Sequence, residues 1–549
     1  MRNLRKNTKY IFVVGGVMSG VGKGVTTSSI GTIIQSKGYR VSLIKADPYL
    51  NVDAGTMNPT EHGEVFVLDS GLETDQDMGN YERFLNKSLP KQIYMTHGMV
   101  FKYVIDKERA LGYKGKCVEP TYHITEEILR RIDECVTVNN SEFVIVEIGG
   151  TIGEYQNAIF LEAARQLKLQ NPNNVMFVMV SYLPTPSSIG EMKTKPTQNA
   201  VSQMNSYGVH PNIIIARADQ PVDKKRKEKI ANMSGLYSAD DVISAPNVKN
   251  IYDVPINFEN DGLSARILKY FDIKPKKKDL KEWRSFVSKM DNVKNTVKIA
   301  VVGKYFETGD FVLSDAYISV IEALKISGAY NGVKTELSWL DAKSFEKGGK
   351  SLDKLKNFDG ILVPGGFGET GVEGKIKVIE YARKNKVPYF GLCYGMQLMV
   401  VEYARNVLGL KDANTVEINP KTENPVIDIM PDQKKKLEIK NFGGSMRLGT
   451  YPCIVSKKTI AYDAYGKTKI DERHRHRYEV NPSYVEKIEK AGLIFSGKSP
   501  NGVLMEIAEL PRTVHPFMLG VQFHPEFLAR PLSPHPLFST FVKACIKKK

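Results

Sequence analysis

The residues whose types and spacing are best suited to chemistry surround Cys393, in the stretch Phe-Gly-Leu-Cys-Tyr-Gly-Met-Gln at 390–397. The apolar run 387–390 predicts the end of a buried strand, and residues 396–403 predict a helix. Cys393 therefore falls on a tight strand-to-helix turn, which projects the thiol outward. The N-terminus of the helix favours the thiolate over the thiol. This pattern indicates a cysteine nucleophile.

A thiolate nucleophile needs a base, and the downstream segment His-Pro-Glu at 524–526 offers one. His524 could take the thiol proton, and Glu526 could orient the ring. Upstream, a Gly-Gly loop at 365–366 follows the apolar run 361–363, and such a loop can direct backbone N–H groups at a developing oxyanion. A lone cysteine is more often a small buried hydrophobe. The agreement of three separate segments favours catalysis here.

These three segments resemble the class I glutamine amidotransferases. The resemblance implies that the C-terminal half hydrolyses glutamine and releases ammonia. It places the oxyanion hole at the N–H groups of Gly366 and Tyr394. It assigns glutamine binding to Gly366, Tyr394, Gln397, Glu417 and Arg477.

A glycine-rich loop at 15–24 follows the first apolar strand and precedes a predicted helix, which is the context that phosphate binding requires. Backbone N–H groups and the helix N-terminus would bind phosphate, and Lys23 adds a point charge. The loop is closer to those of dethiobiotin-synthetase-like and chromosome-partitioning ATPases than to a regular Walker A sequence. Gly24 stands where the magnesium-binding Ser or Thr would be, so metal ligands must come from elsewhere.

Two carboxylates are the candidates for that metal. Glu147 ends the buried strand 143–146, and Asp77 closes the acidic stretch 73–77. A carboxylate at the carboxyl end of a strand beside a phosphate loop suits Mg²⁺, which takes few protein oxygens and adds phosphate oxygens. The alternative for each residue is a solvated turn or cap. Lys45, which ends the second strand, could neutralise charge during phosphoryl transfer.

Composition excludes several classes of protein. Five cysteines without metal-ligand spacing indicate a reducing compartment and no disulfide framework. No apolar run is long enough to span a bilayer or to form a signal-peptide core, so we expect a cytoplasmic protein with no membrane partner. The formal charge of +16 could indicate nucleic acid binding. We favour a lysine-rich surface with pockets for anionic ligands, because no RNA- or DNA-binding motif is present.

Repeated strand–helix units predict an α/β protein with two doubly wound parallel-sheet domains. The first would be P-loop NTPase-like, close to dethiobiotin synthetase, and the second flavodoxin-like. In the N-terminal half the predicted strands cover 10–14, 41–44, 143–146, 175–182, 213–216 and 242–244. We expect domains at 1–272 and 297–549. In the charged linker 273–296, Leu280, Trp283 and Phe286 predict a short helix packed on a domain surface.

Several motifs in the first half occur in the order typical of one family. They include Gly-Gly-Val-x-Ser-Gly-x-Gly-Lys-Gly at 15–24, Lys-x-Asp-Pro-Tyr at 45–49, Asn-Val-Asp-x-Gly-Thr-Met at 51–57, Val-Glu-Ile-Gly-Gly-Thr at 146–151 and Lys-Thr-Lys-Pro-Thr-Gln at 193–198. With the glutaminase half, the chain resembles the CTP synthase family over essentially its whole length. The resemblance implies ATP-dependent amination of UTP to CTP through a 4-phosphorylated intermediate. Ammonia would travel through an internal tunnel with His62 and Val65 near its mouth.

The resemblance also assigns nucleotide contacts. ATP would meet Gly20, Val21, Gly22, Lys23, Gly24, Val25, Asp77 and Val248, with Lys23 and Lys45 serving phosphoryl transfer. UTP or CTP would meet Ser19, Glu154, Tyr155, Gln156, Lys193, Thr194, Lys195, Pro196, Thr197, Gln198 and Lys229. In an extended loop Lys193 and Lys195 would point the same way, toward a polyanion. The implied cofactor is Mg²⁺ with ATP, with no redox cofactor and no nucleic acid partner.

Regulation and assembly are implied in the same way. Family members are homotetramers that CTP inhibits and GTP activates, the latter through a flexible basic loop at 443–449 near Arg447. Three departures from the family pattern bear on this control. Gln156 replaces a carboxylate, Tyr122 lies in an altered segment, and Thr370 replaces an arginine. They put nucleotide selectivity, CTP feedback and GTP coupling in doubt.

Two other functions fit parts of the sequence. An ATP-dependent amidoligase with a fused glutaminase, such as a cobyric-acid-type amidase, would share the phosphate loop but not the motif at 193–198. A partitioning-type ATPase could carry an amidotransferase half that serves only structure or filament formation. The intact set of Cys393, His524 and Glu526 argues against that second alternative.

Overall fold

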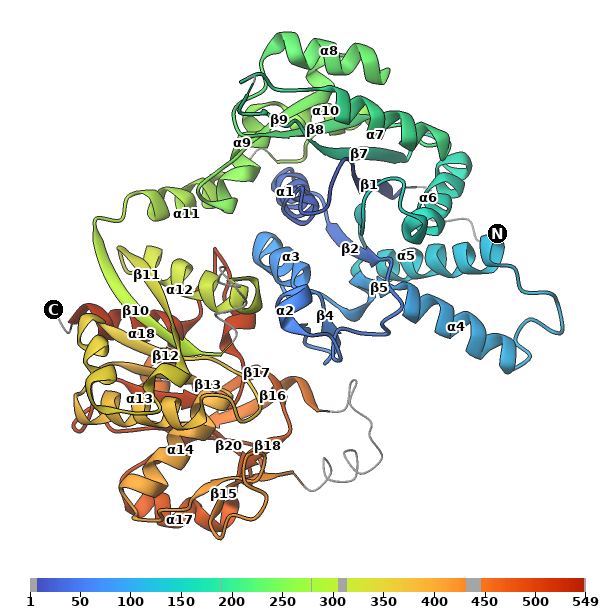
Figure 1. Cartoon of the computed structure of the whole chain (residues 1–549). Coiled ribbons are helices and arrows are strands. Elements are labelled where there is room, and N and C mark those ends of the chain that lie inside the picture. The colour runs from blue at the N-terminus through green and yellow to red at the C-terminus, as the bar shows by residue number, and fades with distance from the viewer. Residues whose placement is uncertain (1–6, 189, 278, 305–313, 431–445, 548–549) are drawn as a thin grey trace. The chain divides into compact units, whose positions relative to one another are not determined.

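The computed structural model describes residues 7–188, 190–277, 279–304, 314–430 and 446–547 (Figure 1). The chain forms two compact units. The first comprises Met1–Asp53 and Asn80–Val287, and the second comprises Ala54–Gly79 and Ser288–Lys549. A segment from the N-terminal half of the sequence thus folds with the C-terminal half.

Seven parallel strands form the sheet of the first unit, in the order β5-β2-β6-β1-β7-β8-β9. Their bounds are β1 Lys9–Gly15, β2 Val41–Asp47, β5 Tyr94–Thr96, β6 Phe143–Ile148, β7 Val175–Tyr182, β8 Ile213–Ala218 and β9 Val242–Pro246. The six predicted strands are all present, and the predicted α/β fold is confirmed. The three-residue strand β5 was not predicted, because so short a run carries no periodicity.

Helices cover this sheet, with α1, α5, α6 and α7 packed directly on its strands (Figure 1). The helices are α1 Lys23–Ser36, α3 Asp77–Leu85, α4 His97–Arg109, α5 Thr125–Asn139, α6 Ala158–Gln170, α7 Lys195–Ser206, α8 Lys224–Ser234, α9 Val254–Asn260, α10 Leu263–Tyr270 and α11 Lys281–Asp291. Helices α3 and α11 each run across a boundary between the two units. Because all seven strands are parallel, their carboxyl ends meet at one edge, where α/β proteins bind ligands.

The main sheet of the second unit has nine strands in the order β11-β10-β12-β13-β21-β20-β19-β16-β17. They are β10 Asn295–Gly303, β11 Val333–Asp341, β12 Gly360–Val363, β13 Tyr389–Leu392, β16 Arg447–Val455, β17 Lys469–His476, β19 Ile494–Lys498, β20 Met505–Glu509 and β21 Met518–Val521. The strands from β11 to β21 pair in parallel, and those from β21 to β17 pair antiparallel. The sequence did not predict this antiparallel half.

Both faces of the parallel part are buried. Ile361 and Val363 of β12 belong to one hydrophobic cluster, and Leu362 between them belongs to another on the opposite face. The covering helices are α12 Ile318–Tyr330, α13 Val372–Lys384, α14 Tyr394–Asn406, α16 Ile460–Tyr465, α17 Pro482–Lys490 and α18 Pro536–Lys547. A strand buried on both faces needs a continuous apolar run, which is why β12 and β13 were visible in the sequence.

Smaller elements complete the second unit. Strands β14 Asn414–Thr415, β15 Pro425–Ile429 and β18 Tyr478–Val480 form a small sheet. Helix α2 Pro59–His62 and the antiparallel pair β3 Phe66–Val67 and β4 Glu73–Thr74 come from the segment Ala54–Gly79. We call residues 66–74 the β3–β4 hairpin. Within the described part of the chain, none of the helices has the length and hydrophobicity needed to cross a membrane.

Helix α11 confirms the short helix predicted in the linker. Trp283 and Phe286 are buried, and Trp283 Nε1 donates to the carbonyl oxygen of Tyr252 at 2.8 Å. The Tyr252 ring packs edge-on against both aromatic side chains. Aromatic burial therefore fastens this helix to the first unit.

We expect Trp283→Phe to destabilise the first unit by about 1–3 kcal/mol, because it removes the donor to the buried Tyr252 carbonyl and leaves a gap. Differential scanning calorimetry measures the change. Lys281→Gln, at an exposed position of the same helix, is the control. Equal unfolding temperatures for the two variants would contradict the assigned role of Trp283.

Candidate functional site

Cys393 lies on the predicted turn between β13 and α14. Its backbone has φ 47° and ψ −98°, a conformation that non-glycine residues rarely adopt. The nearby glycines Gly391 and Gly395 have no room for a side chain. A Cβ on Gly391 would approach the carbonyl carbon of Gly395 to 2.7 Å, and a Cβ on Gly395 would approach the carbonyl oxygen of Val363 to 2.3 Å. Close backbone packing therefore imposes the turn.

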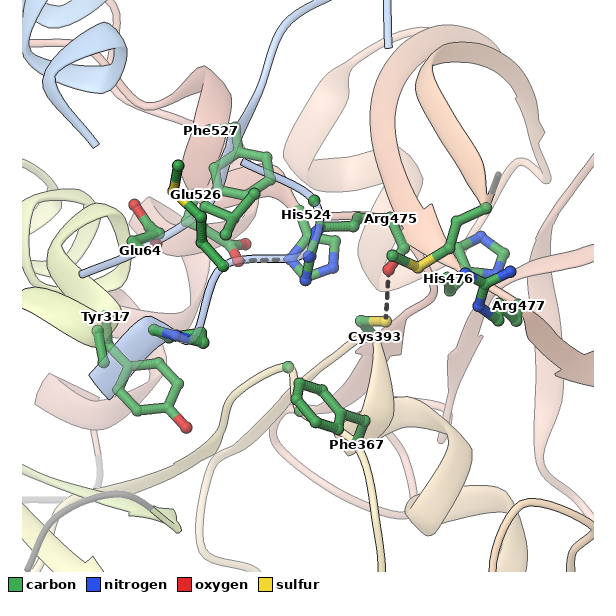
Figure 2. A pocket seen from close by; sticks show the side chains of 18 of the residues that line it. Glu64, Tyr317, Phe367, Cys393, Arg475, His476, Arg477, His524, Glu526 and Phe527 are labelled. Carbon is green, nitrogen blue, oxygen red and sulfur yellow. Dashed lines mark hydrogen bonds and ion pairs between the residues drawn. The ribbon is translucent and has the colours of Figure 1, made fainter. Parts of the chain in front are cut away.

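The Cys393 thiol is held from two sides. Its Sγ lies 3.9 Å from the carbonyl oxygen of Arg475 on β17 (Figure 2). Gln522 Nε2 donates to the sulfur at 3.6 Å. The backbone N–H of Cys393 donates to the carbonyl oxygen of Val521 at 2.6 Å. The side chain is buried, so its orientation is fixed by these contacts.

His524 and Glu526 form the expected pair, with Nδ1 and Oε1 2.7 Å apart (Figure 2). Burial disfavours the imidazolium, but the Glu526 carboxylate and Cys393 outweigh that effect and raise the pKa of His524 to about 10. Glu526 occupies Nδ1, which leaves Nε2 to exchange a proton with Cys393. A Cβ on Gly365 would lie 2.8 Å from Cε1 of His524, so the ring needs glycine in this loop.

These side chains open into a cavity of about 710 Å³ within the second unit. Seven of the residues singled out from the sequence line it: Gly366, Cys393, Gln397, Glu417, Arg477, His524 and Glu526. The Tyr394 side chain is buried beside the cavity rather than lining it, with its Cδ1 3.9 Å from where a Cβ on Gly366 would lie. The structure thus brings the predicted residues of the C-terminal half to one place.

The cavity presents both charges that an amino acid ligand needs. The N–H of Gly368 donates to Glu417 Oε1 at 2.8 Å, and burial raises the pKa of the Glu417 carboxyl. Burial lowers the pKa of the Arg477 guanidinium. Gln397 Nε2 donates to the carbonyl oxygen of Tyr478 at 3.0 Å. An anion and a cation therefore face the same space as the thiol.

Sequence reasoning missed several residues of this site. Gln522 and Arg475 contact the Cys393 sulfur, and Phe367 lines the cavity. Lys375 is buried beside the Tyr394 ring, and burial lowers the pKa of its amino group to about 8. Gln522 and Phe367 adjoin motifs that the sequence did reveal, so proximity to those motifs could have identified them.

Part of the cavity wall comes from the segment Ala54–Gly79. Gly55 to Pro59, Glu64 and Val65 line it. Val65 was expected near the mouth of a tunnel, as was His62, which does not line this cavity. A stretch of the N-terminal half therefore forms part of the thiol site.

The glycine-rich loop of the first unit has the geometry of a phosphate cradle. Gly20 and Gly22 adopt φ of 70° and 89°, and α1 begins directly after Gly22. Lys23 Nζ donates to the carbonyl oxygen of Gly150 at 2.7 Å, which places its charge at the carboxyl ends of β1 and β6. Arg217, not predicted, lies 3.5 Å from where a Cβ on Gly22 would be.

Arg217 also reaches the segment that contains Val248. It donates to Asn247 Oδ1 at 2.8 Å, and the half-buried Val248 follows in the chain. Arg217 therefore lies beside the glycine-rich loop and is bonded to the residue before Val248, so it connects the two predicted ATP-binding segments. No sequence signal marked it, because its role depends on the pairing of β8 with β9.

Lys45 and Glu147 form a buried pair at the ends of β2 and β6. Lys45 Nζ lies 2.8 Å from Glu147 Oε1 and 3.8 Å from Asp47, and the Tyr81 hydroxyl donates to Glu147 Oε2 at 2.5 Å. Asp77 is the first residue of α3 and belongs to the second unit. No group of three or more His, Cys, Asp or Glu within the described residues is arranged to hold a metal. A carboxylate donor with so few companions fits Mg²⁺ that completes its shell with phosphate oxygens and water.

The residues expected to meet UTP fall into an exposed group and a buried one. Glu191 accepts from Lys193 at 2.8 Å, and this bond, with Arg226 and Lys229 nearby, lowers the pKa of Glu191. Helix α7 begins at Lys195, so the expected extended loop was wrong for that lysine.

Thr194 and Thr197 are buried. Gln198 donates to Thr194 at 3.1 Å, and the Thr197 hydroxyl bonds Ser181 at 2.8 Å. In this structure the Thr197 hydroxyl is therefore bonded to strand β7 of the sheet, through Ser181. The remaining residues of this group, Ser19, Lys195, Pro196 and Lys229, are exposed or half-buried.

Glu154 interacts with both segments that are expected to bind nucleotide. It feels the charge of Lys23 in the phosphate loop, and it accepts a hydrogen bond from Gln156 in its own segment. Burial opposes its ionisation, but hydrogen bonds from Thr151 and Gln156, together with the charge of Lys23, lower the pKa of the Glu154 carboxyl. Gln156, one of the departures from the family pattern, donates to Glu154 at 2.6 Å. Tyr155 is almost fully exposed.

Of the expected regulatory loop at 443–449, residues 443–445 lie outside the described residues. Arg447 begins strand β16 and is buried, with ion pairs to Glu479 at 3.0 Å and Glu506 at 2.8 Å. The expectation of a flexible loop was wrong for 447–449. Buried ion pairs and strand pairing explain the difference.

Comparison with known proteins matches the chain to two families, one after the other along the sequence. Residues 9–273 match the family "CTP synthase N-terminus", and residues 312–544 match the family "Glutamine amidotransferase class-I". The chain is 47% identical to a CTP synthase of Pyrococcus abyssi over 99% of its own length and 98% of the relative's. It is 48% identical to one of Carboxydothermus hydrogenoformans over 98% of its own length and 99% of the relative's.

Part of the chain also matches several solved structures. The glutaminase domain of a Trypanosoma brucei CTPS, with bound acivicin, is 36% identical. The match covers 46% of this chain and 95% of the other, with a TM-score of 0.42.

We expect Glu526→Gln to lower the pKa of His524, because the carboxylate is the largest of the effects that raise it. With a pKa of about 10 in place of the ordinary 6.5, protonated His524 stabilises the fold fully below about pH 6.5 and loses that effect as the pH rises through 10. In the variant the loss comes at lower pH.

NMR titration of ring-labelled histidine measures this change, with the His524 signal identified from its absence in His524→Asn. An unchanged titration midpoint in Glu526→Gln would show that Glu526 does not set the protonation of the ring.

Proposed function

The chain belongs to the CTP synthase family, and from that premise we propose how its residues divide the reaction between the two halves. Members are glutamine-hydrolysing ligases of pyrimidine nucleotide biosynthesis, and the matches over both halves assign UTP, ATP and glutamine as substrates. The observation that supports the division is the Cys393–His524–Glu526 arrangement on one unit and a separate phosphate loop on the other.

In the glutaminase half, the Cys393 thiolate attacks the amide carbon of glutamine. His524 accepts the thiol proton and returns it to the departing ammonia, and Glu526 holds the ring through Nδ1. The N–H groups of Gly366 and Tyr394 stabilise the oxyanion. The turn supports this role, because the strained backbone of Cys393 presents the sulfur beside the first helical N–H groups of α14.

Glutamine is recognised at its α-carbon by two opposite charges. Arg477 binds the carboxylate, for which a guanidinium supplies two parallel donors. Glu417 binds the α-ammonium group, and Gln397, which lines the same cavity, adds a further glutamine contact. Both charged residues line the cavity that contains Cys393, which supports the assignment.

In the synthetase half, ATP phosphorylates O4 of the uracil ring. This step converts a poor leaving group into phosphate, which ammonia displaces at C4. Lys23 and the N–H groups of residues 20–24 hold the ATP phosphates, with Val25, Asp77 and Val248 completing the ATP contacts. Lys45, buried against Glu147, offsets charge as the phosphoryl group moves.

Mg²⁺ fits the Glu147 carboxylate at the carboxyl end of β6, and Asp77 and Glu147 are the residues that the family resemblance proposes to hold it. When bound it neutralises phosphate charge. Glu147 is already oriented by Lys45 and Tyr81, so its carboxylate is positioned before nucleotide arrives.

UTP binds through the lysines around Glu191, and its ring reaches the loop of Glu154. Lys193 and Lys229 approach the triphosphate, and both already influence Glu191. When the ion pair between Glu191 and Lys193 breaks, the Lys193 ammonium group becomes able to bind phosphate. The full proposed set is Ser19, Glu154, Tyr155, Gln156, Lys193, Thr194, Lys195, Pro196, Thr197, Gln198 and Lys229.

Ammonia must arrive unprotonated, because ammonium has no lone pair. We therefore propose an internal tunnel that starts near Val65, which lines the thiol cavity. We also propose that the protein is a cytoplasmic homotetramer that GTP activates and CTP inhibits. Gln156, Tyr122 and Thr370 are the positions at which residues connected with that control depart from the family pattern.

Cys393→Ala should abolish glutamine-dependent CTP formation and leave CTP formation from ammonium chloride intact, because only the nitrogen source is lost. Absorbance of UTP conversion with ATP and Mg²⁺ measures both rates. Cys453→Ala, at a buried cysteine away from the cavity, controls for loss of a thiol. Loss of both rates in Cys393→Ala would refute the division of labour.

Glu147→Gln should give the opposite pattern. Removing the charge leaves Lys45 without its carboxylate partner and weakens the hold on Mg²⁺, so CTP formation from either nitrogen source should fall about 100-fold. Glutamine hydrolysis should persist. Glu142→Gln, on a partly exposed carboxylate just before β6, is the matched control. Equal rates in the two variants would remove Glu147 from the phosphoryl site.

A further inference from the structure

Strand β17 holds both reacting side chains of the thiol site through its backbone. The carbonyl oxygen of Arg473 accepts the N–H of His524 at 2.7 Å, and the carbonyl oxygen of Arg475 lies 3.9 Å from Cys393 Sγ. The two carbonyls are two residues apart on one strand. Any shift of β17 along its length would therefore disturb the support of both Cys393 and His524.

The side chains of the same two arginines are bound by the β3–β4 hairpin. Arg475 Nε lies 2.9 Å from Glu73 Oε1, and Arg473 Nε lies 2.6 Å from Asp69 Oδ1. Glu73 is 1% exposed, and Arg473 is fully buried beneath the Phe66 ring. One member of each pair is buried, Glu73 in the first and Arg473 in the second, so separating either pair would leave a buried charge without its partner.

The hairpin is also packed closely on the neighbouring strand β16. A Cβ on Gly449 would come within 2.6 Å of the Asp69 carbonyl oxygen, and a Cβ on Gly71 within 2.9 Å of the Leu448 carbonyl oxygen. Phe66 meets Phe527 with ring centroids 4.9 Å apart. The hairpin thus fits β16 and β17 at backbone distance and cannot slide independently of them.

The same hairpin leads directly into helix α3. Asp77 lies four residues after Glu73 and begins α3, and Tyr81 one turn later donates to Glu147 in the first unit. Chain continuity therefore ties the position of the hairpin to the start of α3.

We propose that Glu73 is a positioning residue for glutamine hydrolysis, acting through Arg475 on Cys393. This inference rests on the proposed function. It is distinct from it, because Glu73 contacts neither glutamine nor nucleotide in the assignments above. A hairpin that only stabilised the fold would affect both half-reactions together.

The test uses the full chain with Glu73→Gln, which removes the charge, and Glu73→Asp, which keeps it at shorter reach. Glu486→Gln, which breaks a solvent-exposed ion pair with Lys490, is the matched control. For each variant we would measure kcat and KM of glutamine hydrolysis, CTP formation from ammonium chloride, and the rate of Cys393 alkylation by iodoacetamide.

We expect Glu73→Gln to lower kcat of glutamine hydrolysis about tenfold, with KM and ammonium-dependent CTP formation within about twofold of wild type. The rate of Cys393 alkylation should differ from that of wild type, because the strand beside the sulfur has lost its carboxylate partner. Glu73→Asp should give an intermediate kcat, and it decides the matter if Glu73→Gln does not fold.

Glutamine hydrolysis and alkylation equal to those of Glu486→Gln would overturn the inference. So would an equal fall in both half-reactions, which would reduce Glu73 to a folding role. Failure of the wild-type chain to form CTP from ammonium would instead overturn the proposed function, so the two failures are distinguishable.

Discussion

The chemistry of the second unit depends on a backbone constraint at Cys393. A non-glycine residue at φ 47° and ψ −98° costs about 1–3 kcal/mol, and the fold must hold it there. The absence of side chains at Gly391 and Gly395 lets β12, β13 and the start of α14 approach at backbone distance. Both faces of β13 are buried, so the strain is offset by packing that cannot relax locally.

The sequence predicted this turn because its causes are local. Two glycines around one cysteine, an apolar run before them and a helical stretch after them are all within twenty residues. The same holds for the phosphate loop, where Gly20 and Gly22 supply positive φ and Lys23 follows at once. Predictions of this kind succeed because short-range sterics determine them.

Long-range pairings were beyond the reach of such reasoning. Arg473 and Arg475 lie in a stretch dense in charge, a pattern that by itself is typical of an exposed strand. Their partners Asp69 and Glu73 lie about four hundred positions earlier, and nothing local marks the four as neighbours. The helix start at Lys195 and the strand at Arg447 were missed for a similar reason, since tertiary contacts decide whether a basic loop is ordered.

The path of the chain between its two units has a consequence for how the protein comes apart. The polypeptide crosses from one unit to the other three times, after Asp53, after Gly79 and after Val287. A protease that cut only the last of these crossings would produce two fragments. Segment Ala54–Gly79 of the N-terminal fragment would still be packed in the C-terminal fragment. The fully buried Arg473 guanidinium and the close backbone packing at Gly71 and Gly449 would hold it there. A nicked molecule should therefore remain one particle in the absence of denaturant, with both halves retained.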